Sequence, residues 1–288
     1  MIFRVIHDHL APEFTIADCC RALGVSVSGY YRWKRSPIGL RETREARLLE
    51  HVRSAHEASR GLYGAPRVRE ALVHQGIVRD RKTIARIMRK NRLRSRAAKK
   101  WRPRTTDSNH RHAVAANTLD RRFAQVPGPD RVWLADITYL PTAEGFVYLA
   151  AVMDLCSRKI VGWAMADSLR GELTVDALTM AIARRDPKPG LVHHSDRGTQ
   201  YAAGEYRSLL ASRGMESSMS RAGDCHDNAP MESFWSTLKK ELTMGKAFAT
   251  RVEARLAVFE YVEVFYNRQR LHSGVGYQSP EAFEASRR

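Results

Sequence analysis

Residues 191–201 read LVHHSDRGTQY. The apolar start predicts a short buried strand, and its far end is crowded with polar and ionisable side chains, among them Asp196. These residues alone suit three interpretations. Asp196 can belong to a turn, since Asp-x-Gly is ordinary turn chemistry. It can join His193 and His194 in a zinc site, or a hydrolase can use Ser195 as its nucleophile.

Other acids occupy comparable positions. The apolar stretch VWLADITYL contains Asp136, AVMDLCS contains Asp154 near a strand end, and Glu232 falls in the first turn of the helix predicted for DNAPMESFWSTLKKEL. A carboxylate inside an apolar strand costs several kcal/mol unless something pairs with it. Carboxylates gathered at strand ends and a helix start repel one another, and oxygen-only ligands suit magnesium or manganese better than zinc. We expect Asp154 to be structural rather than catalytic.

The excess of positive charge is confined to the first part of the chain. Residues 1–125 hold 28 Lys and Arg against 11 Asp and Glu, whereas residues 126–288 hold 20 of each. Such asymmetry favours a polyanionic partner, most often nucleic acid. The neutral second part predicts a separate domain with a different role.

Two helix-turn-helix patterns lie in the basic part. In residues 14–35 a Gly24 turn separates two short helices, and the second helix would offer Ser28, Tyr30, Arg32 and Lys34 to DNA. The second pattern covers residues 61–93, and from 79 to 104 there are 13 Lys and Arg against one acid, which favours phosphate binding. The candidate DNA contacts of these two patterns are Arg32, Lys34, Arg81, Lys82, Arg86, Arg89, Lys90, Arg92 and Arg94.

The pattern of apolar and polar residues changes near residue 130, and the rest of the domain organisation follows from that change. Three strands, a helix, a strand, a helix, a strand and further helices predict a mixed α/β layered domain. We expect a helix-turn-helix-like segment at 1–38, a second such DNA-binding domain at 39–98, a basic linker at 99–126, a catalytic core at 127–244, and a C-terminal helix and tail at 245–288.

Several classes of protein are disfavoured. No run of about 18 apolar residues predicts a membrane span, and the N-terminus lacks the apolar stretch of a signal peptide. We therefore expect a cytoplasmic protein, associated with the nucleoid when bound to DNA. The four cysteines form no C-x-x-C pair, so structural zinc and a disulfide framework are not expected.

Motifs at four places resemble a known family. The stretches DITYL, HHSDRGTQY, DNAPMESFWSTLKKE and YNRQRLHSGVGYQSPEAF, together with an Asp, Asp, 35-residue gap, Glu series, resemble insertion-sequence transposases with a retroviral-integrase-type core. The sequence departs from the pattern of this family at Gly274-Val275 in the tail. The resemblance covers nearly the whole chain and implies a ribonuclease H-like core in which Asp136, Asp196 and Glu232 hold metal.

The resemblance also implies a reaction. Two Mg²⁺ or Mn²⁺ ions would activate water or a DNA 3′-hydroxyl and stabilise the leaving oxygen in an in-line displacement at phosphorus. Arg197 and Lys239 would contact DNA, with His194 tuning the site or contacting phosphate, and Asn228 would orient the site or cap its helix. Arg268, Arg270 and His272 would bind DNA or pack the tail.

Partners and alternatives remain open from sequence. The expected partners are double-stranded DNA, as terminal inverted repeats and target, other copies of the chain on DNA, and a helix-turn-helix protein from an upstream reading frame. A metal-dependent nuclease without strand transfer and a DNA-binding regulator are the alternatives. Repeat sequence, target preference, order of cleavage and joining, and oligomeric state cannot be inferred from the sequence.

Overall fold

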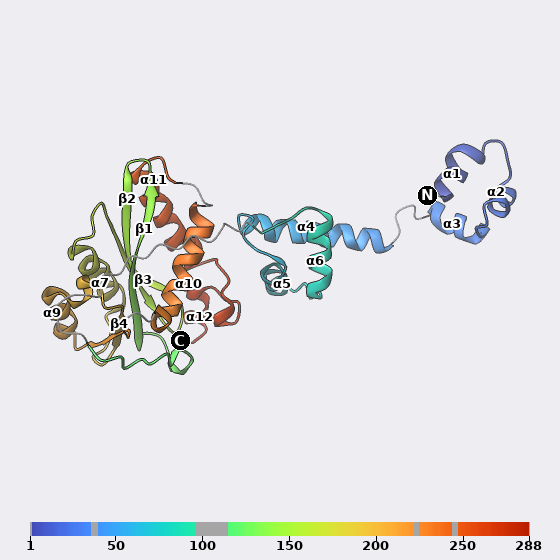
Figure 1. Cartoon of the computed structure of the whole chain (residues 1–288). Coiled ribbons are helices and arrows are strands. Elements are labelled where there is room, and N and C mark those ends of the chain that lie inside the picture. Colours follow the sequence, from blue (N-terminus) through green and yellow to red (C-terminus); the bar gives the residue numbers. More distant parts are fainter. Residues whose placement is uncertain (1, 36–39, 96–114, 222–224, 244–246, 288) are drawn as a thin grey trace. The chain divides into compact units, whose positions relative to one another are not determined.

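The computed structural model describes residues 2–35, 40–95, 115–221, 225–243 and 247–287, and divides the chain into two compact units, Met1–Arg94 and Ser95–Arg288 (Figure 1). Within the described residues, no helix has the length and apolar character needed to cross a membrane. The basic stretch around Trp101 lies outside these residues.

The first helices of the basic unit share a small core. They are α1 (Ile2–Val5), which continues as the π-helical turn η1 (Ile6–Leu10), α2 (Ile16–Ala22) and α3 (Val27–Arg35). Ile6, Cys19, Cys20 and Tyr30 form the buried centre. Tyr30 is only 1% exposed and its hydroxyl hydrogen-bonds to His7 Nδ1 at 3.0 Å, so the expectation that Tyr30 faces DNA is wrong. The sequence analysis missed the helix that covers it.

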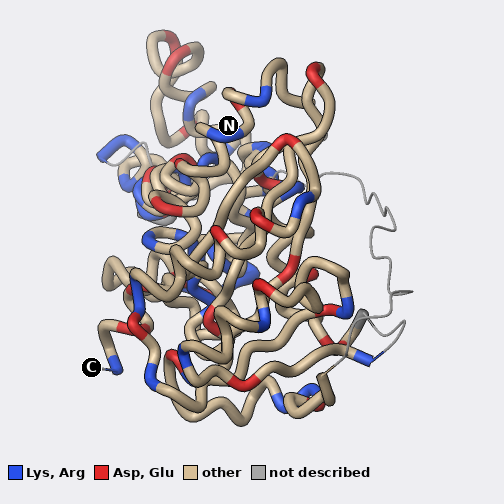
Figure 2. The backbone as a smooth tube through the Cα atoms, turned by 90° about the vertical axis from the view of Figure 1, so that its left-hand side faces the viewer, with Lys and Arg blue, Asp and Glu red and all other residues tan. Residues whose placement is uncertain are grey.

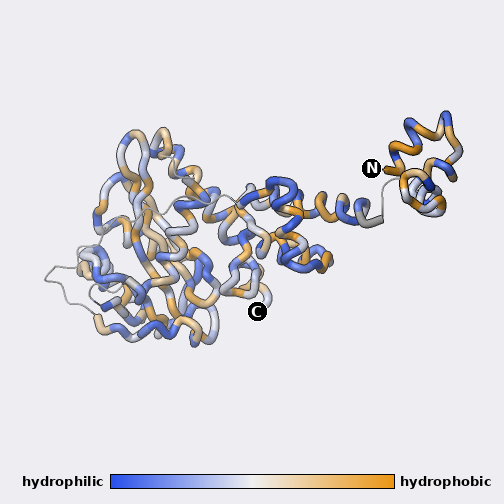
Figure 3. Tube along the Cα trace, turned by 45° about the vertical axis from the view of Figure 1, so that its right-hand side comes forward, coloured by the Kyte–Doolittle hydropathy of each residue, from blue (hydrophilic) through white to orange (hydrophobic). Residues whose placement is uncertain are grey.

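The second group in this unit contains the predicted three helices. They are α4 (Leu40–Ala58), α5 (Ala65–His74) and α6 (Arg81–Lys90). Asp80 caps α6 by accepting hydrogen bonds from the backbone N–H groups of Lys82 and Thr83, as expected of an N-terminal Asp. Apolar side chains at helical spacing on α5 and α6, including Leu72, Ile84 and Ile87, are fully buried, while the basic side chains of α6 remain exposed. Hydrophobic and hydrophilic residues alternate along the trace of these helices (Figure 3).

The second unit is built on a five-stranded sheet. Its strands are β1 (Val132–Thr142), β2 (Gly145–Asp154), β3 (Ile160–Ala166), β4 (Val192–Ser195) and β5 (Glu216–Met219), in the order β3-β2-β1-β4-β5. The pairs β1–β2 and β2–β3 are antiparallel, whereas β1–β4 and β4–β5 are parallel. This order with its helices is the predicted ribonuclease H-like arrangement.

Helices cover both faces of the sheet (Figure 1). One face packs against α7 (Glu172–Arg185), α8 (Thr199–Ala202) and α9 (Gly204–Ser212). At Gly162 a side chain would meet Ala177 O at 2.2 Å, so the missing Cβ lets α7 lie directly on β3. The turn η3 (Cys225–Asn228) leads into α10 (Ala229–Leu238), η4 (Lys239–Thr243), α11 (Arg251–Phe259) and η5 (Glu260–Tyr266), of which α10 packs against β1 and α11 against β2. Acidic and basic residues are interspersed over this unit (Figure 2).

Residues 115–126, expected to be linker, are part of this unit's packing. The backbone N–H of Thr118 donates to Ser218 Oγ at 3.0 Å, and Leu119 is buried. Asp227 accepts hydrogen bonds from Arg121 and Arg221. The expected linker residues 99–114 lie outside the described part of the chain.

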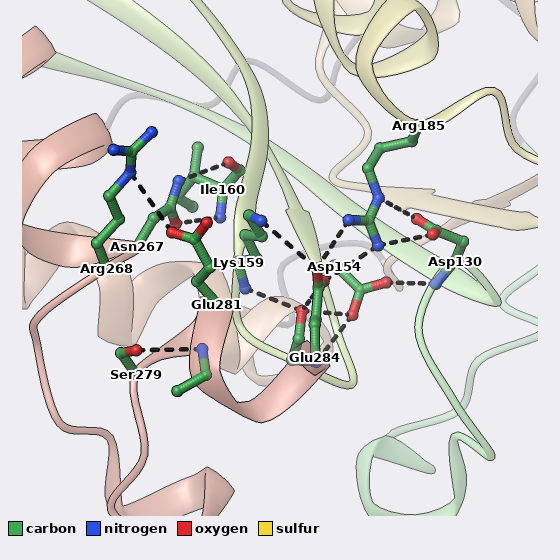
Figure 4. Close-up of polar contacts among 12 residues, drawn as sticks. Asp130, Asp154, Lys159, Ile160, Arg185, Asn267, Arg268, Ser279, Glu281 and Glu284 are labelled. Carbon is green, nitrogen blue, oxygen red and sulfur yellow. Dashed lines mark hydrogen bonds and ion pairs between the residues drawn. The ribbon is translucent and has the colours of Figure 1, made fainter. Parts of the chain in front are cut away.

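The tail contains η6 (Ser273–Val275) and α12 (Pro280–Ala285). Polar contacts hold it against the sheet (Figure 4). Asn267 donates to Ile160 O at 3.0 Å and accepts from Ile160 N at 2.9 Å, as a neighbouring strand would. Glu284, 6% exposed, accepts from Ser157 Oγ at 2.8 Å and pairs with Arg185 at 2.8 Å. Arg270 is buried in an ion pair with Glu241 at 2.7 Å. Of the two roles expected for Arg270, the structure shows packing.

Candidate active site

Strand register brings the two aspartates of the predicted triad together. In the parallel pair β1–β4, Val132 lies beside Val192 and Leu134 beside His194. The paired residues end at Leu134 and His194. The same offset, continued for two residues, would bring Asp136 level with Asp196, which follows the last residue of β4. The charge of Asp196 acts on Asp136, which agrees with this placement. The alternation of side chains along β1 sends Asp136 to the face covered by α10, because Trp133 and its alternate neighbours point into the core under α7.

The start of α10 is anchored next to Asp136. Asn228 donates from Nδ2 to Ala135 O at 3.2 Å, and Trp235 donates from Nε1 to Asp136 Oδ2 at 2.9 Å. Glu232 lies between these two anchors, in the first turn of α10, and its side chain is exposed. Asn228 makes no side-chain cap on α10, so of its two expected roles the structure shows the orienting contact.

The three carboxylates influence one another electrostatically. Burial, the Asp196 carboxylate and then the Glu232 carboxylate raise the pKa of Asp136 well above its ordinary range, although hydrogen bonds from Ile137 N and Trp235 act in the opposite direction. Among the described residues, no three His, Cys, Asp or Glu side chains are gathered closely enough to hold a metal ion. The donor set is nevertheless made of carboxylate oxygens, which suit a hard divalent cation.

Two buried polar atoms beside this site lack partners among the described residues. They are the Tyr201 hydroxyl and Asn228 Oδ1. Tyr201 is 2% exposed, and its pKa is raised by burial, by Tyr206 and then by the charges of Asp136 and Asp196. The sequence analysis did not single out Tyr201 or Trp235, because an aromatic residue in a helix is most often part of the core.

The histidines of HHSD are structural. The Tyr206 hydroxyl hydrogen-bonds to His193 Nε2 at 2.9 Å, and the His194 ring nitrogens hydrogen-bond to Ser218 and Ser220 at 2.9 and 3.2 Å. Burial lowers the pKa of His193 to about 3 and that of His194 to about 4, so both rings are neutral near pH 7. Because each histidine is buried in such contacts, a zinc site here is disfavoured, and the expectation that His194 contacts phosphate is wrong.

The other residues considered in the sequence analysis differ in their contacts. Ser195 Oγ donates to the backbone oxygen of Asp196, which argues against a nucleophilic serine. Arg197 donates to Ser220 O at 2.7 Å. Lys239 lies over the Tyr139 ring at 4.9 Å, and burial lowers its pKa while the charge of Asp136 opposes that shift. Asp154 is fully buried and accepts from Asp130 N and from Ser157, so its structural role is confirmed.

The candidate DNA contacts of the basic unit are all exposed, as expected for Arg32, Lys34, Arg81, Lys82, Arg86, Arg89, Lys90, Arg92 and Arg94. Two of them are not free in the structure. Arg86 and Lys90 pair with Glu45 at 3.0 and 2.9 Å. A sequence pattern on one helix could not show this acid, because Glu45 comes from α4.

Comparisons with known proteins agree with this architecture. Integrase core domain models match residues 126–225 and 213–280, and an HTH-like domain model matches residues 43–101. The "Insertion element IS600 uncharacterized 31 kDa protein" of Shigella sonnei is 45% identical over 264 residues, covering 92% of this chain and 96% of that protein. "Transposase InsF for insertion sequence IS3A" of Escherichia coli (strain K12) is 40% identical over 286 residues, covering 99% and 98%.

Among solved structures, a chain of the simian T-cell lymphotropic virus intasome bound to PP2A regulatory subunit B56 gamma aligns with a TM-score of 0.47 and 14% identity, over 75% of this chain and 70% of that one. The curated relatives match along nearly their whole length, and the domain models cover both units. The chain therefore belongs to the insertion-sequence transposases of the InsF type, DNA-binding polynucleotidyl transferases with an integrase-type catalytic core.

Proposed function

We propose that Asp136, Asp196 and Glu232 are the catalytic carboxylates of this transposase. The parallel β1–β4 register, which brings Asp136 level with Asp196 when continued for two residues, is the observation that supports the assignment. The electrostatic influence of Glu232 on Asp136 adds the third member. This assignment accounts for a carboxylate inside an apolar strand, which is otherwise costly to bury.

The same three side chains would hold the divalent ions. When bound, two Mg²⁺ or Mn²⁺ ions supply activation of the attacking oxygen and stabilisation of the leaving 3′ oxygen at phosphorus. The protein keeps Asp136 oriented through Trp235 and Ile137 N, and Asn228 ties the start of α10 to β1. The buried Tyr201 hydroxyl would donate a hydrogen bond to a ligand carboxylate.

DNA would contact the catalytic unit at the active site, and it would also contact the basic unit. Lys239, beside Tyr139 and within the influence of Asp136, would meet a phosphate of the reacting strand, as would Arg197. The exposed cations of the basic unit would bind the terminal inverted repeats, while target DNA enters at the carboxylates. Joining two ends requires two active sites or one used twice, so we propose a homo-oligomer on DNA, assisted by the upstream-frame helix-turn-helix protein.

A strand-transfer assay tests the assignment. Labelled DNA with the element's own ends is incubated with the full chain in Mg²⁺, Mn²⁺ or EDTA. Asp196→Asn should abolish joined products, whereas Asp176→Asn, which removes an exposed carboxylate of α7, should leave them unchanged. Joining by Asp196→Asn at the normal rate would overturn the assignment. Cleavage without joining by the normal chain would favour the nuclease alternative.

A further inference from the structure

A pocket of about 720 Å³ opens at the end of the sheet where β1 begins. Its walls come from residues 123–126, from the turn between β2 and β3, from the loop at 274–278, and from α12 with its following residues. Leu155 N bonds to Val132 O, which fixes that turn against the first residue of β1. Asp196 follows the opposite, C-terminal end of the neighbouring parallel strand, so the pocket is separate from the carboxylates.

The side chains that line this pocket are basic, neutral polar and apolar. Arg158 and Arg287 supply positive charge, Gln278 adds an amide, and Phe123 and Phe283 supply ring surfaces. No acid is present among the described residues that line it. Such a lining suits an anionic group attached to a flat or apolar body.

Arg158 is the distinctive member. It is half-buried, and within the described residues its guanidinium has no hydrogen bond or ion pair. Asp154 acts on it electrostatically, but the Asp154 oxygens already accept hydrogen bonds from Asp130 N and Ser157. A partly buried guanidinium whose N–H donors remain available at a pocket wall can offer them to an anionic ligand.

The backbone at this residue is also unusual. Arg158 has φ of 65°, in the left-handed region that non-glycine residues seldom adopt. Glycine or asparagine would be the ordinary residue at such a turn position. An arginine kept in a strained turn, pointing donors into a pocket, indicates a ligand for those donors.

Space is left beside the guanidinium. A Cβ placed on Gly274 would lie 4.0 Å from Arg158 Nε and meet nothing nearer. Arg287, whose guanidinium stacks at 4.3 Å over the Phe283 ring, stands at the same opening and is exposed. Two guanidinium groups lining one opening would supply the paired N–H donors through which arginine binds phosphate.

We propose that this pocket binds a backbone phosphate of the DNA on which the transposase acts, at a position remote from the catalytic carboxylates. The inference rests on DNA binding by the chain and is independent of which carboxylates carry the reaction. The pocket would hold the DNA where it passes the N-terminal end of β1.

The test measures DNA binding by the full chain in EDTA as a function of salt. Removing one protein–phosphate interaction should reduce the slope of log affinity against log salt by about 0.9. Arg158→Gln should lower the slope by that amount, and Arg158→Gln with Arg287→Gln by about twice as much. Arg213→Gln removes the same charge from an exposed position outside the pocket and should leave the slope unchanged. Equal slopes for Arg158→Gln and Arg213→Gln would overturn the proposal.

Two further measurements locate the bound phosphate. Gly274→Leu keeps every charge but fills the space beside Arg158, so it should weaken DNA binding to a similar extent. Cys156, half-exposed in the pocket, should react more slowly with iodoacetamide when DNA is bound, as measured by mass spectrometry. Protection of Cys156 that depends on protein concentration and needs no DNA would show that a second protein chain fills the pocket, and would refute the DNA assignment. Circular dichroism confirms that each variant is folded.

Discussion

Replacing Tyr201 with phenylalanine should stabilise the metal-free protein. The Tyr201 ring packs edge-on against Tyr206, with centroids 5.3 Å apart, and a phenylalanine ring keeps that contact. The hydroxyl is buried without a hydrogen-bond partner among the described residues. Leaving such a group desolvated costs about 1–3 kcal/mol. We expect the unfolding free energy to rise by that amount, and the Tm by roughly 2–4 °C for each kcal/mol.

The same substitution should weaken metal binding. Burial and then Tyr206 raise the pKa of Tyr201, and the charges of Asp136 and Asp196 add to that shift. A hydrogen bond from the hydroxyl to a ligand carboxylate would form when the ions draw these carboxylates together. Loss of an outer partner of a metal ligand typically costs about 10- to 100-fold in affinity. The variant should therefore combine higher stability with weaker Mn²⁺ binding.

Differential scanning calorimetry and calorimetric titration with Mn²⁺ measure both quantities. Tyr206→Phe is the matched control, since the Tyr206 hydroxyl bonds to His193 at 2.9 Å. That control should lose about 1–3 kcal/mol of stability and keep its Mn²⁺ affinity. A lower Tm for Tyr201→Phe would mean that its hydroxyl already has a partner. An unchanged Mn²⁺ affinity would mean that it does not serve the carboxylates.

Three other predictions concern polar contacts of both units. Glu284→Ala should lower the unfolding free energy of the catalytic unit by about 1.5–3 kcal/mol in urea titrations, because it removes a buried acceptor of hydrogen bonds from Ser157 and Arg185, although Arg185 keeps its pair with Asp130; an unchanged midpoint would contradict this. Hydrogen bonds, chiefly from Arg221, hold the pKa of Asp227 below its ordinary value. The ionised Asp227 side chain should therefore stabilise the fold fully above about pH 4, and this stabilisation should be lost as the pH falls further. The stability difference between the normal chain and Asp227→Asn should therefore shrink below about pH 4, and a difference independent of pH would refute the assignment. Glu45→Gln should release Arg86 and Lys90 and strengthen DNA binding at low salt, measured by fluorescence anisotropy, whereas weaker binding would show that Glu45 positions these cations for DNA.

Much of the architecture was predictable because it depends on local periodicity. Apolar runs over residues 132–140 and 145–154 predicted strands, and Asp136 was recognisable because it interrupts such a run. The predicted Gly24 turn separates two short helices in the structure.

The remaining features depend on contacts between distant segments. The sequence could not show that Tyr30 faces inward, because the burying surface comes from the N-terminal helix. It could not show that His194 hydrogen-bonds to Ser218, which belongs to β5, and to Ser220, which follows β5. Whether Asp136, Asp196 and Glu232 act together stays a prediction that the strand register supports.

The Glu284 contact has a consequence for protein synthesis. Glu284 accepts a hydrogen bond from Ser157, which lies 127 residues earlier in the chain. A ribosome adding about 5–20 residues each second needs on the order of ten seconds to cover that interval. The helical unit is therefore complete while the sheet still lacks its final ion pairs. Translation that stops before Glu284 would produce a fragment that keeps the DNA-binding helices but has an unfinished catalytic unit.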